Sequence, residues 1–597
     1  MKKPWSISTT VRSPERLRAF LRVLKTLEGQ KFDKSKQEEF QIRLIKERLY
    51  SPTKISQKYK EIFDDPSKEL SLEIAKDIFK YQKYKDPPMR GRQSANPLNK
   101  LGFCIARENY ESIKITPLGN LFLSEDYNIS KVFLKSLLRL QFPNLWSERF
   151  GEESGFNISP FITLLHLIKK TDYLTQSEFS YFVPTLTDYK EIDKYAKIIL
   201  RLRKEKTKSD KDKVVQDFLK KFYQTKNPSL TQINNLFDYG DNIMRYFRLT
   251  KYFRFIKNTL GGWKIDFEPA RIKEISQLLN IYDGSIKKFD KLEDYLEYLS
   301  DITLPRLPWE IDINKSVEIV ISLRDLLNKE YSTLANLIKI SLKKDFDSLS
   351  KKDVSKLDMK EVDVIIEQIR LFRLKISQIK EGENLRRNLV ELKRIIFVLK
   401  DKQEFRKVDP TEFEYLIFQT LKILDDEINI KTNSILDDEG KPIGFAPGSK
   451  PDIEGFYQTF NAIFEVTLDT SRSQVYRESM PIMRHLRDFE NGNLDKESYC
   501  VFISPRIHED TNNYFWFSVK HGYEGKKQKI VSLDLPNYID ILESFILAVE
   551  GNKNFNHKRL KEIFEKIISN AEIQNSSTLW LGNISANIQE WKKEILA

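Results

Sequence analysis

Apolar residues recur at every third or fourth position through much of the chain, which predicts a mainly helical protein. The segment 13–29 is a clear example. Ser13 is expected to cap its helix, Pro14 to occupy the first turn and Gly29 to end it. One face of this helix is apolar, and its members are Leu17, Phe20, Leu21, Leu24 and Leu27. These positions predict burial of that face.

A break in the helical pattern follows at residues 80–107, which hold seven basic residues and one acid. The stretch KYKDPPMRGRQSANPLNK is rich in Pro, Gly, Asn and Arg, so it is predicted to be a basic loop that reaches DNA. Two strands are expected next, at Gly102–Arg107 and Ser112–Thr116, and then a helix starting near Pro117. Helices followed by such a hairpin are typical of a winged helix-turn-helix domain.

A second region has the same order of elements. Residues 229–245 read as a helix, and two short strands are expected on either side of Asn258–Gly262. Basic and aromatic residues alternate in YFRLTKYFRFIK, residues 246–257. Such interleaving suits a surface that contacts phosphates, and it equally suits an amphipathic element with a solvated edge. Both interpretations stay open.

The second half of the chain changes from helices to mixed elements. Residues 310–406 contain few Gly or Pro and predict long helices that act as a linker. After Pro410, a helix over 411–424 is expected, then strands and helices in alternation. The expected strands are Ile453–Tyr457, Asn461–Thr467 and Ser498–Ile503, and the expected helices are Ser471–Glu490 and Tyr538–Val549. Alternating strands and helices indicate an α/β domain.

These patterns predict a multi-domain fold with a mainly α N-terminal half. Residues 1–150 and 151–285 are expected to form two DNA-recognition winged-helix domains. Residues 286–404 are expected to form a helical linker domain, and residues 405–597 the C-terminal α/β domain.

Composition narrows the functional classes. The chain has 597 residues, of which 40% are hydrophobic, so several cores can form. Two cysteines, Cys104 and Cys500, cannot build a disulfide scaffold or a Cys-based zinc site. The five histidines form no HExxH motif. With no run of 18 apolar residues and no apolar stretch after MKKPWSISTT, we expect a cytoplasmic protein without a membrane partner.

Charge points weakly to a polyanionic partner. The 100 Lys and Arg exceed the 87 Asp and Glu, and residues 1–50 alone hold 13 basic against 6 acidic residues. Double-stranded DNA is the partner we expect. The candidate DNA-binding residues are Arg12, Arg16, Arg18, Arg90, Arg92, Lys100, Arg248, Lys251 and Arg254.

Two carboxylates in the C-terminal domain carry the sharpest chemical signal. Asp452 follows Pro451 at the start of one expected strand, and Glu465 lies on the next strand. Hydrolysis of a phosphodiester is assisted by Mg²⁺, which takes carboxylate oxygens as ligands. The main-chain carbonyl of Val466 is a further candidate ligand. In the alternative interpretation, this is an ordinary strand pair whose acids form turns or salt bridges.

This arrangement resembles the PD-(D/E)xK nuclease motif, here Pro451-Asp452 … Glu465-Val466-Thr467. The family usually has Lys where this chain has Thr467. A hydroxyl cannot supply the positive charge of that lysine. Either another residue compensates or the motif is accidental.

The longer segment KPDIEGFYQTFNAIFEVTLDTSRSQVYRESMPIMRHL resembles the catalytic segment of the AlwI-like family of type IIS and nicking restriction endonucleases. The helix SPERLRAFLRVLKTLEG and the motif ITPLG are similar to that family more loosely. The resemblance implies catalytic roles for Asp452, Glu465, Glu478, His485 and Glu414. It also implies a PD-(D/E)xK nuclease fold for the C-terminal domain.

The resulting hypothesis is a Mg²⁺-dependent, site-specific DNA endonuclease that reads a short asymmetric site and cuts a few bases away. Double-strand cleavage would need a second nuclease subunit or a transient homodimer. The alternative is a non-catalytic, sequence-specific DNA-binding protein with a degenerate nuclease domain, and Thr467 is its main support. A methyltransferase or an ATP-driven subunit is disfavoured, because GxGxxG after a strand and GxxxxGK[ST] are both missing from the sequence.

Overall fold

A computed structural model describes residues 3–597 except 9, 12–13, 65–69, 125–127, 145–154, 258–262, 407, 425–428, 445, 447–449, 471 and 473. The chain forms two compact units. Unit 1 comprises Met1–Ser56 and Ser71–Arg373, and unit 2 comprises Gln57–Leu70 and Leu374–Ala597. Among the described residues, no helix has both the length and the apolar character needed to span a membrane. The division into four domains stays a prediction.

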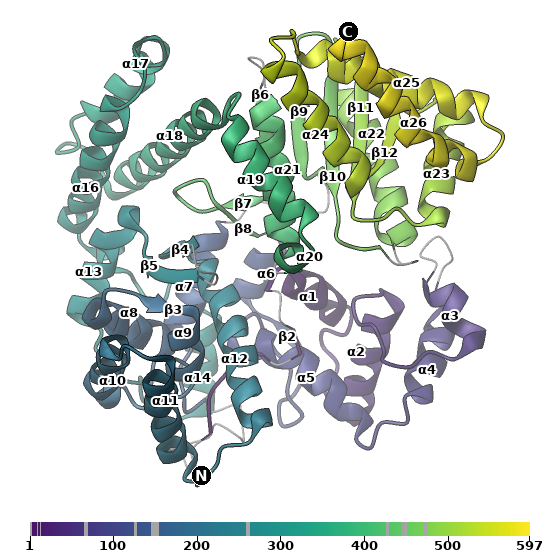
Figure 1. The fold of residues 1–597 in the computed structure, drawn as a ribbon. Helices are drawn as coiled ribbons and strands as arrows, with labels where there is room; N and C mark the ends of the chain where they lie inside the picture. The colour runs from purple at the N-terminus through teal and green to yellow at the C-terminus, as the bar shows by residue number, and fades with distance from the viewer. Residues whose placement is uncertain are drawn as a thin grey trace. The chain divides into compact units, whose positions relative to one another are not determined.

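Unit 1 is mainly helical (Figure 1). Its helices are α1 (Leu17–Lys25), α2 (Lys34–Lys46), α4 (Leu72–Tyr81), α5 (Pro87–Lys100), α6 (Pro117–Leu123), α7 (Ile129–Arg139), α8 (Pro160–Thr171), α9 (Gln176–Phe182), α10 (Ile192–Lys204), α11 (Lys208–Tyr223), α12 (Leu230–Arg248), α13 (Ile272–Ile281), α14 (Leu292–Ser300), α15 (Pro308–Ile311), α16 (Ile313–Ser332) and α17 (Asn336–Ser350). Its strands are β1 (Cys104–Ile105), β2 (Lys114–Ile115), β3 (Leu174–Thr175), β4 (Phe253–Lys257) and β5 (Trp263–Phe267).

The first predicted helix is confirmed in its apolar face. Leu17, Leu21 and Leu24 are fully buried, and Gly29 ends the following turn with φ of +82°. The predicted cap Ser13 lies outside the described residues.

The prediction of a basic loop within residues 80–107 is wrong, because Pro87–Lys100 is helix α5. Two of the three prolines that suggested a loop occupy the first turn, where a missing N–H costs nothing, and Pro97 lies inside the helix. Asp86 caps the helix by accepting a hydrogen bond from the backbone N–H of Met89 at 3.2 Å. Gly91 lets α5 approach α2 closely, since a Cβ there would lie 1.9 Å from the Gln37 carbonyl oxygen.

The two predicted hairpins are confirmed. Strands β1 and β2 pair antiparallel, and so do β4 and β5, which β3 extends into a three-stranded sheet. Helix α12 begins after Ser229, which forms a capping box with Gln232. The described structure gives the helix–hairpin order but does not by itself define winged-helix modules, so that interpretation stays a prediction.

The helices predicted within residues 310–406 are confirmed, and their role as a linker stays a prediction. Helix α18 (Met359–Leu385) runs 27 residues, and it is followed by α19 (Leu389–Lys400) and α20 (Lys402–Phe405). In unit 1, Arg370 pairs with Glu274 at 2.8 Å, and Arg373 binds both oxygens of Glu330. These buried pairs fix the first part of α18 to α13 and α16.

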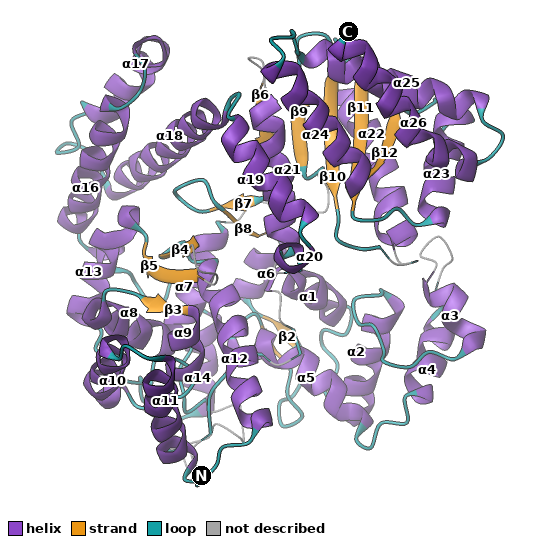
Figure 2. Ribbon diagram, viewed as in Figure 1, coloured by secondary structure: helices purple, strands orange, loops and turns teal. Residues whose placement is uncertain are grey.

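Unit 2 contains the predicted α/β region, which is confirmed as a five-stranded mixed sheet (Figure 2). The sheet order is β12-β11-β10-β9-β6. Strands β10, β11 and β12 are parallel, whereas β9 is antiparallel to both of its neighbours. Its strands are β6 (Asn429–Thr432), β9 (Ile453–Phe456), β10 (Asn461–Val466), β11 (Ser498–Ser504) and β12 (Ile530–Asp534), and a separate hairpin is formed by β7 (Ile435–Leu436) and β8 (Pro442–Gly444). The helices are α3 (Gln57–Asp64), α21 (Pro410–Leu424), α22 (Met480–Gly492), α23 (Glu509–Lys520), α24 (Leu535–Glu550), α25 (His557–Ile573) and α26 (Ser577–Leu596).

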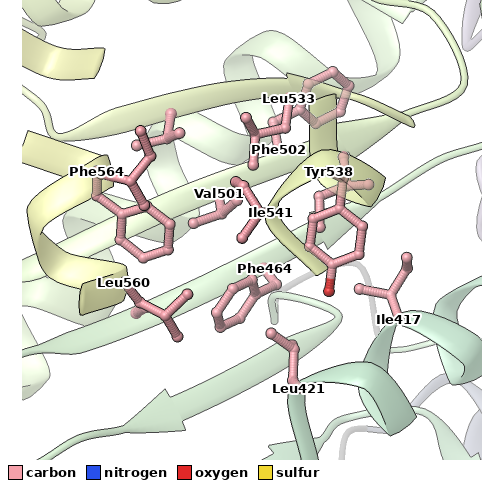
Figure 3. Packing of buried hydrophobic residues seen from close by; sticks show 14 of the residues in the cluster. Ile417, Leu421, Phe464, Val501, Phe502, Leu533, Tyr538, Ile541, Leu560 and Phe564 are labelled. Atoms are coloured by element: carbon pink, nitrogen blue, oxygen red, sulfur yellow. The ribbon is translucent and has the colours of Figure 1, made fainter. Parts of the chain in front are cut away.

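The core of unit 2 lies between the sheet and these helices. Figure 3 shows side chains of α21, α24 and α25 gathered around Phe464 of β10 and Val501 of β11. Side chains alternate along a strand, so Glu465 faces the side of the sheet opposite to Phe464. On that side α22 packs against β10 and β11. Glu465 therefore points towards α22, whereas Glu414 comes from α21, whose apolar side chains pack around Phe464.

Candidate active site

Asp452 and Glu465 lie opposite each other at the ends of neighbouring strands. The antiparallel register pairs Phe464 with Ile453, so the next step along both strands brings Glu465 beside Asp452. Residues that face each other in this way project from the same side of a sheet. The Val466 backbone N–H donates to Asp452 Oδ2 at 2.8 Å, which fixes the Asp452 carboxylate. The predicted pair is thus adjacent in space.

His485 joins this pair from helix α22. Its Nδ1 atom donates to Glu465 Oε1 at 2.8 Å, and both side chains are buried, at 7% and 5% exposed. The bond fixes the orientation of the Glu465 carboxylate.

Glu478 approaches from a π-helical turn, Val475–Ser479, that precedes α22. The predicted helix Ser471–Glu490 is therefore corrected, because one turn is wider than an α-helical turn, and Ser471 and Ser473 lie outside the described residues. Burial raises the pKa of Glu478 to about 7, and a hydrogen bond with Thr467 partly offsets this rise.

Glu414 enters from helix α21 and is 6% exposed. Ser434, just after β6, donates its hydroxyl to Glu414 Oε2 at 3.3 Å. Burial, and then the negative charge of Asp452, raise the pKa of Glu414 to about 9. The effect of Asp452 indicates that Glu414 belongs to the same electrostatic cluster.

The cluster has the donor chemistry of a site for a hard cation. Burial and the charge of Glu465 raise the pKa of Asp452 well above its usual value, and burial and the charge of Glu478 do the same for Glu465. Within the described part of the chain, no three or more His, Cys, Asp or Glu side chains are close enough to form a metal site by themselves. The carboxylates of Asp452 and Glu465 with the Val466 carbonyl are the oxygen donors that fit Mg²⁺.

Sequence reasoning missed two residues that organise this region. One is Ser434, the partner of Glu414 described above. The other is Gln474, which is fully buried and donates to Ser504 Oγ at 2.9 Å and to the Arg506 carbonyl at 3.0 Å, while the His508 N–H donates to it. Gln474 thereby fixes the start of the π-turn to the end of β11. No spacing rule points to a lone amide or hydroxyl of this kind.

Thr467 does not supply the positive charge of the usual lysine. Its hydroxyl is bonded to Glu478 and accepts the Asp469 backbone N–H at 3.1 Å. It serves instead to position an acid of the cluster.

The candidate DNA-binding residues lie apart from this cluster along the sequence, and their surroundings differ. Arg16 is exposed, whereas Arg18 is half-buried and donates to the carbonyls of Leu123 and Ser124 at 3.0 and 2.6 Å. Arg12 lies outside the described residues. Lys100 was predicted wrongly, because it is 2% exposed and donates to the carbonyls of Ser6 and Ile7. Its role is to fix the N-terminal segment.

The remaining candidates keep part of their surface exposed. Arg90 lies over the ring of Tyr84 at 4.5 Å, and Arg92 pairs with Asp86 at 2.9 Å. On the second hairpin, Arg248 lies over Phe255 at 4.7 Å and Arg254 pairs with Asp266 at 3.3 Å. Lys251, which follows α12, is half-buried and has φ of +61°. Their contact with DNA stays a prediction.

The solved structures similar to this chain include three of restriction endonucleases, two of them of FokI. The small subunit of the heterodimeric restriction endonuclease R.BspD6I is 24% identical, with a TM-score of 0.28, covering 33% of this chain and 98% of that chain. Restriction endonuclease FokI is 10% identical, with a TM-score of 0.23, covering 90% of this chain and 95% of that chain. FokI bound to DNA is 11% identical, with a TM-score of 0.20, covering 94% and 99%.

Comparison with curated proteins gives no significant match. The family comparison is decisive, because the family described as AlwI restriction endonuclease matches residues 99–541, about three quarters of the chain. The match includes Asp452, Glu465, Glu478, His485 and Glu414. The chain therefore belongs to the AlwI restriction endonuclease family.

Proposed function

We propose that this protein is a Mg²⁺-dependent, type IIS-like DNA endonuclease that binds a short asymmetric duplex site and cuts a few bases away. The observation that carries the proposal is the buried set of carboxylates at the ends of β9 and β10. Acids kept this close in a buried place raise one another's pKa, and a divalent cation would relieve that repulsion.

Asp452, Glu465 and the Val466 carbonyl are the residues that would hold Mg²⁺. When bound, the cation supplies Lewis-acid polarisation of a phosphoryl oxygen and lowers the pKa of water. His485 holds the Glu465 carboxylate in one orientation through the 2.8 Å bond. Glu478, with a pKa of about 7, can accept a proton near neutral pH.

Cleavage of plasmid DNA tests this proposal. The wild-type protein is expected to give discrete nicks or bands with Mg²⁺ and none with EDTA. Asp452→Asn and Glu465→Gln should abolish cleavage and retain specific binding, because each keeps the side-chain shape and removes a charged donor. Glu572→Gln on α25 is the control, since Glu572 is an exposed acid of the same unit that pairs with Lys527 rather than with the cluster. Cleavage retained by both site variants would refute the assignment.

The non-catalytic alternative rests on Thr467, which replaces the usual lysine. It predicts a mobility shift on specific DNA without any Mg²⁺-dependent cut. Replacing Mg²⁺ with Ca²⁺ is a further test of the nuclease proposal. Because Ca²⁺ is larger and its coordination is more flexible, it should support DNA binding with little cleavage.

A further inference from the structure

Helix α5 has an unusual solvent-facing stripe for this chain. The helix PPMRGRQSANPLNK contains no acidic residue, although the whole protein holds 87. Met89 precedes Arg92 by three residues and Gln93 by four, and all three are partly exposed, so they share one face. Guanidinium and amide groups on this face are donors and acceptors that match base edges, whereas a merely solvated face tends to mix Lys and Glu.

The opposite face of α5 is fixed tightly to the rest of unit 1. Gly91 permits close contact with the Gln37 backbone, and Ser94 donates to Gln41 Oε1 at 2.8 Å. At the far end, Asn99 bonds both the carbonyl and the N–H of Ala106, at 3.1 and 2.8 Å. These contacts join α5 to α2 and to the β1–β2 hairpin, so the helix presents its outer face from a rigid base.

The outer side chains are themselves held in place. Arg92 donates to Gln37 Oε1 at 2.8 Å and to Asp86 Oδ2 at 2.9 Å, and 39% of its side chain remains exposed. Arg90 lies over the Tyr84 ring, and its Nη1 donates to the side-chain Oε1 of Gln93 at 3.5 Å. An arginine oriented by neighbouring acceptors loses little conformational entropy when it binds a base.

From this geometry we infer that α5 is a base-reading helix, in which the Arg92 guanidinium and the Gln93 side-chain amide contact base edges in the major groove and Met89 contacts an apolar edge. The inference rests on the DNA-binding part of the proposed function. The first two turns of α5 carry these residues, which matches helices that enter the groove with their N-terminal part. Arginine pairs well with guanine and glutamine with adenine, while a thymine methyl suits Met89.

Selection from a pool of randomised duplexes tests the inference with the full-length protein, without divalent cations. Wild type, Gln93→Ala and Arg92→Lys are compared, because the lysine keeps the charge but loses the two-pronged donor. Gln216→Ala on α11 is the matched control, since Gln216 is an exposed amide on another helix of unit 1. Each α5 variant should lose roughly ten- to hundred-fold discrimination at one or two base pairs and keep the others. The control should select the wild-type sequence.

Three results would overturn the inference. The first is unchanged base preference in both α5 variants. The second is uniformly weaker binding with unchanged preference, which would mean that these residues contact phosphates. The third is a wild-type protein without sequence preference. A parallel plasmid assay with Mg²⁺ separates the two proposals: selection without cleavage refutes only the nuclease, and cleavage with unchanged preference in the variants refutes only the role of α5.

Discussion

At the residue scale, the candidate site consists of acidic side chains whose pKa values are raised because they are buried close to one another. Asp452, Glu465, Glu478 and Glu414 come from two strands, a π-turn and a helix, and each has its pKa raised first by burial. Hydrogen bonds to a backbone N–H, a serine, a threonine and a histidine oppose this effect or orient the acids. Burial and mutual repulsion therefore favour the protonated forms of these acids.

His485→Ala should lower cleavage about 10- to 100-fold, because it removes the partner that orients Glu465. DNA binding should stay unchanged, and excess Mg²⁺ should restore part of the activity if the loss is in cation affinity. Rates and binding isotherms measured at several Mg²⁺ concentrations separate these effects. His521→Ala is the control, since His521 directly follows α23 and is exposed. Equal rates for the two variants would contradict the role of His485.

The stability of the metal-free protein should fall as pH rises from about 5 to 9. Folded Glu414 keeps its proton up to a pKa of about 9, whereas an unfolded glutamate releases it near 4.5. Between these values the folded state binds more protons, so the free energy of unfolding decreases with pH. Glu414→Gln should flatten this slope. Melting temperatures in EDTA at several pH values measure it, and equal slopes in wild type and variant would refute the shift.

At the element scale, the sequence predicted the helices and strands that follow from the spacing of apolar residues. It missed the elements that depend on contacts between residues far apart in the chain. The apolar stripe of α1, the strands carrying Asp452 and Glu465 and the long helix α18 all follow from periodicity. Helix α5 does not, because its stability depends on Asp86 at the cap and on Gly91 against α2. Likewise, the π-turn that carries Glu478 depends on the buried contacts of Gln474, which no local pattern reveals.

Gly91→Ala tests the close packing of α5. The added Cβ would lie 1.9 Å from the Gln37 carbonyl oxygen, so α5 or α2 must shift, at a cost of about 1–3 kcal/mol. Gly582→Ala in α26 is the opposite case, since a Cβ there meets nothing within 4 Å and should be neutral or stabilising. Urea unfolding of both variants gives the comparison. Equal stability of the two would show that α5 can adjust freely.

At the scale of the whole molecule, the candidate catalytic acids all lie in unit 2, and α5 lies in unit 1. The described residues contain one such acid cluster. A single cluster suits hydrolysis of one strand per engagement. The family supports a restriction endonuclease. The separation of the two regions in sequence and the single acid cluster support an enzyme whose DNA-recognition and nuclease regions are distinct parts of one chain.

Nicked circles should accumulate first when a plasmid with one site is cut. Linear DNA should appear later and rise more steeply than linearly with protein concentration, since a second catalytic unit is needed for the other strand. Gel time courses over a range of protein concentrations measure both products. Linear DNA formed without a nicked intermediate at the lowest concentration would contradict this order.

The close packing of α5 against α2 has a consequence for how DNA sequence preference could diverge among related proteins. Gly91, Ser94 and Asn99 bear the folding role, while Met89, Arg92 and Gln93 face outward. Since the two sets are different residues, substitutions at the outward positions would change the proposed base preference and keep the residues that pack α5 against α2. We expect relatives that differ only at these outward positions to have the same fold and to recognise different DNA sequences.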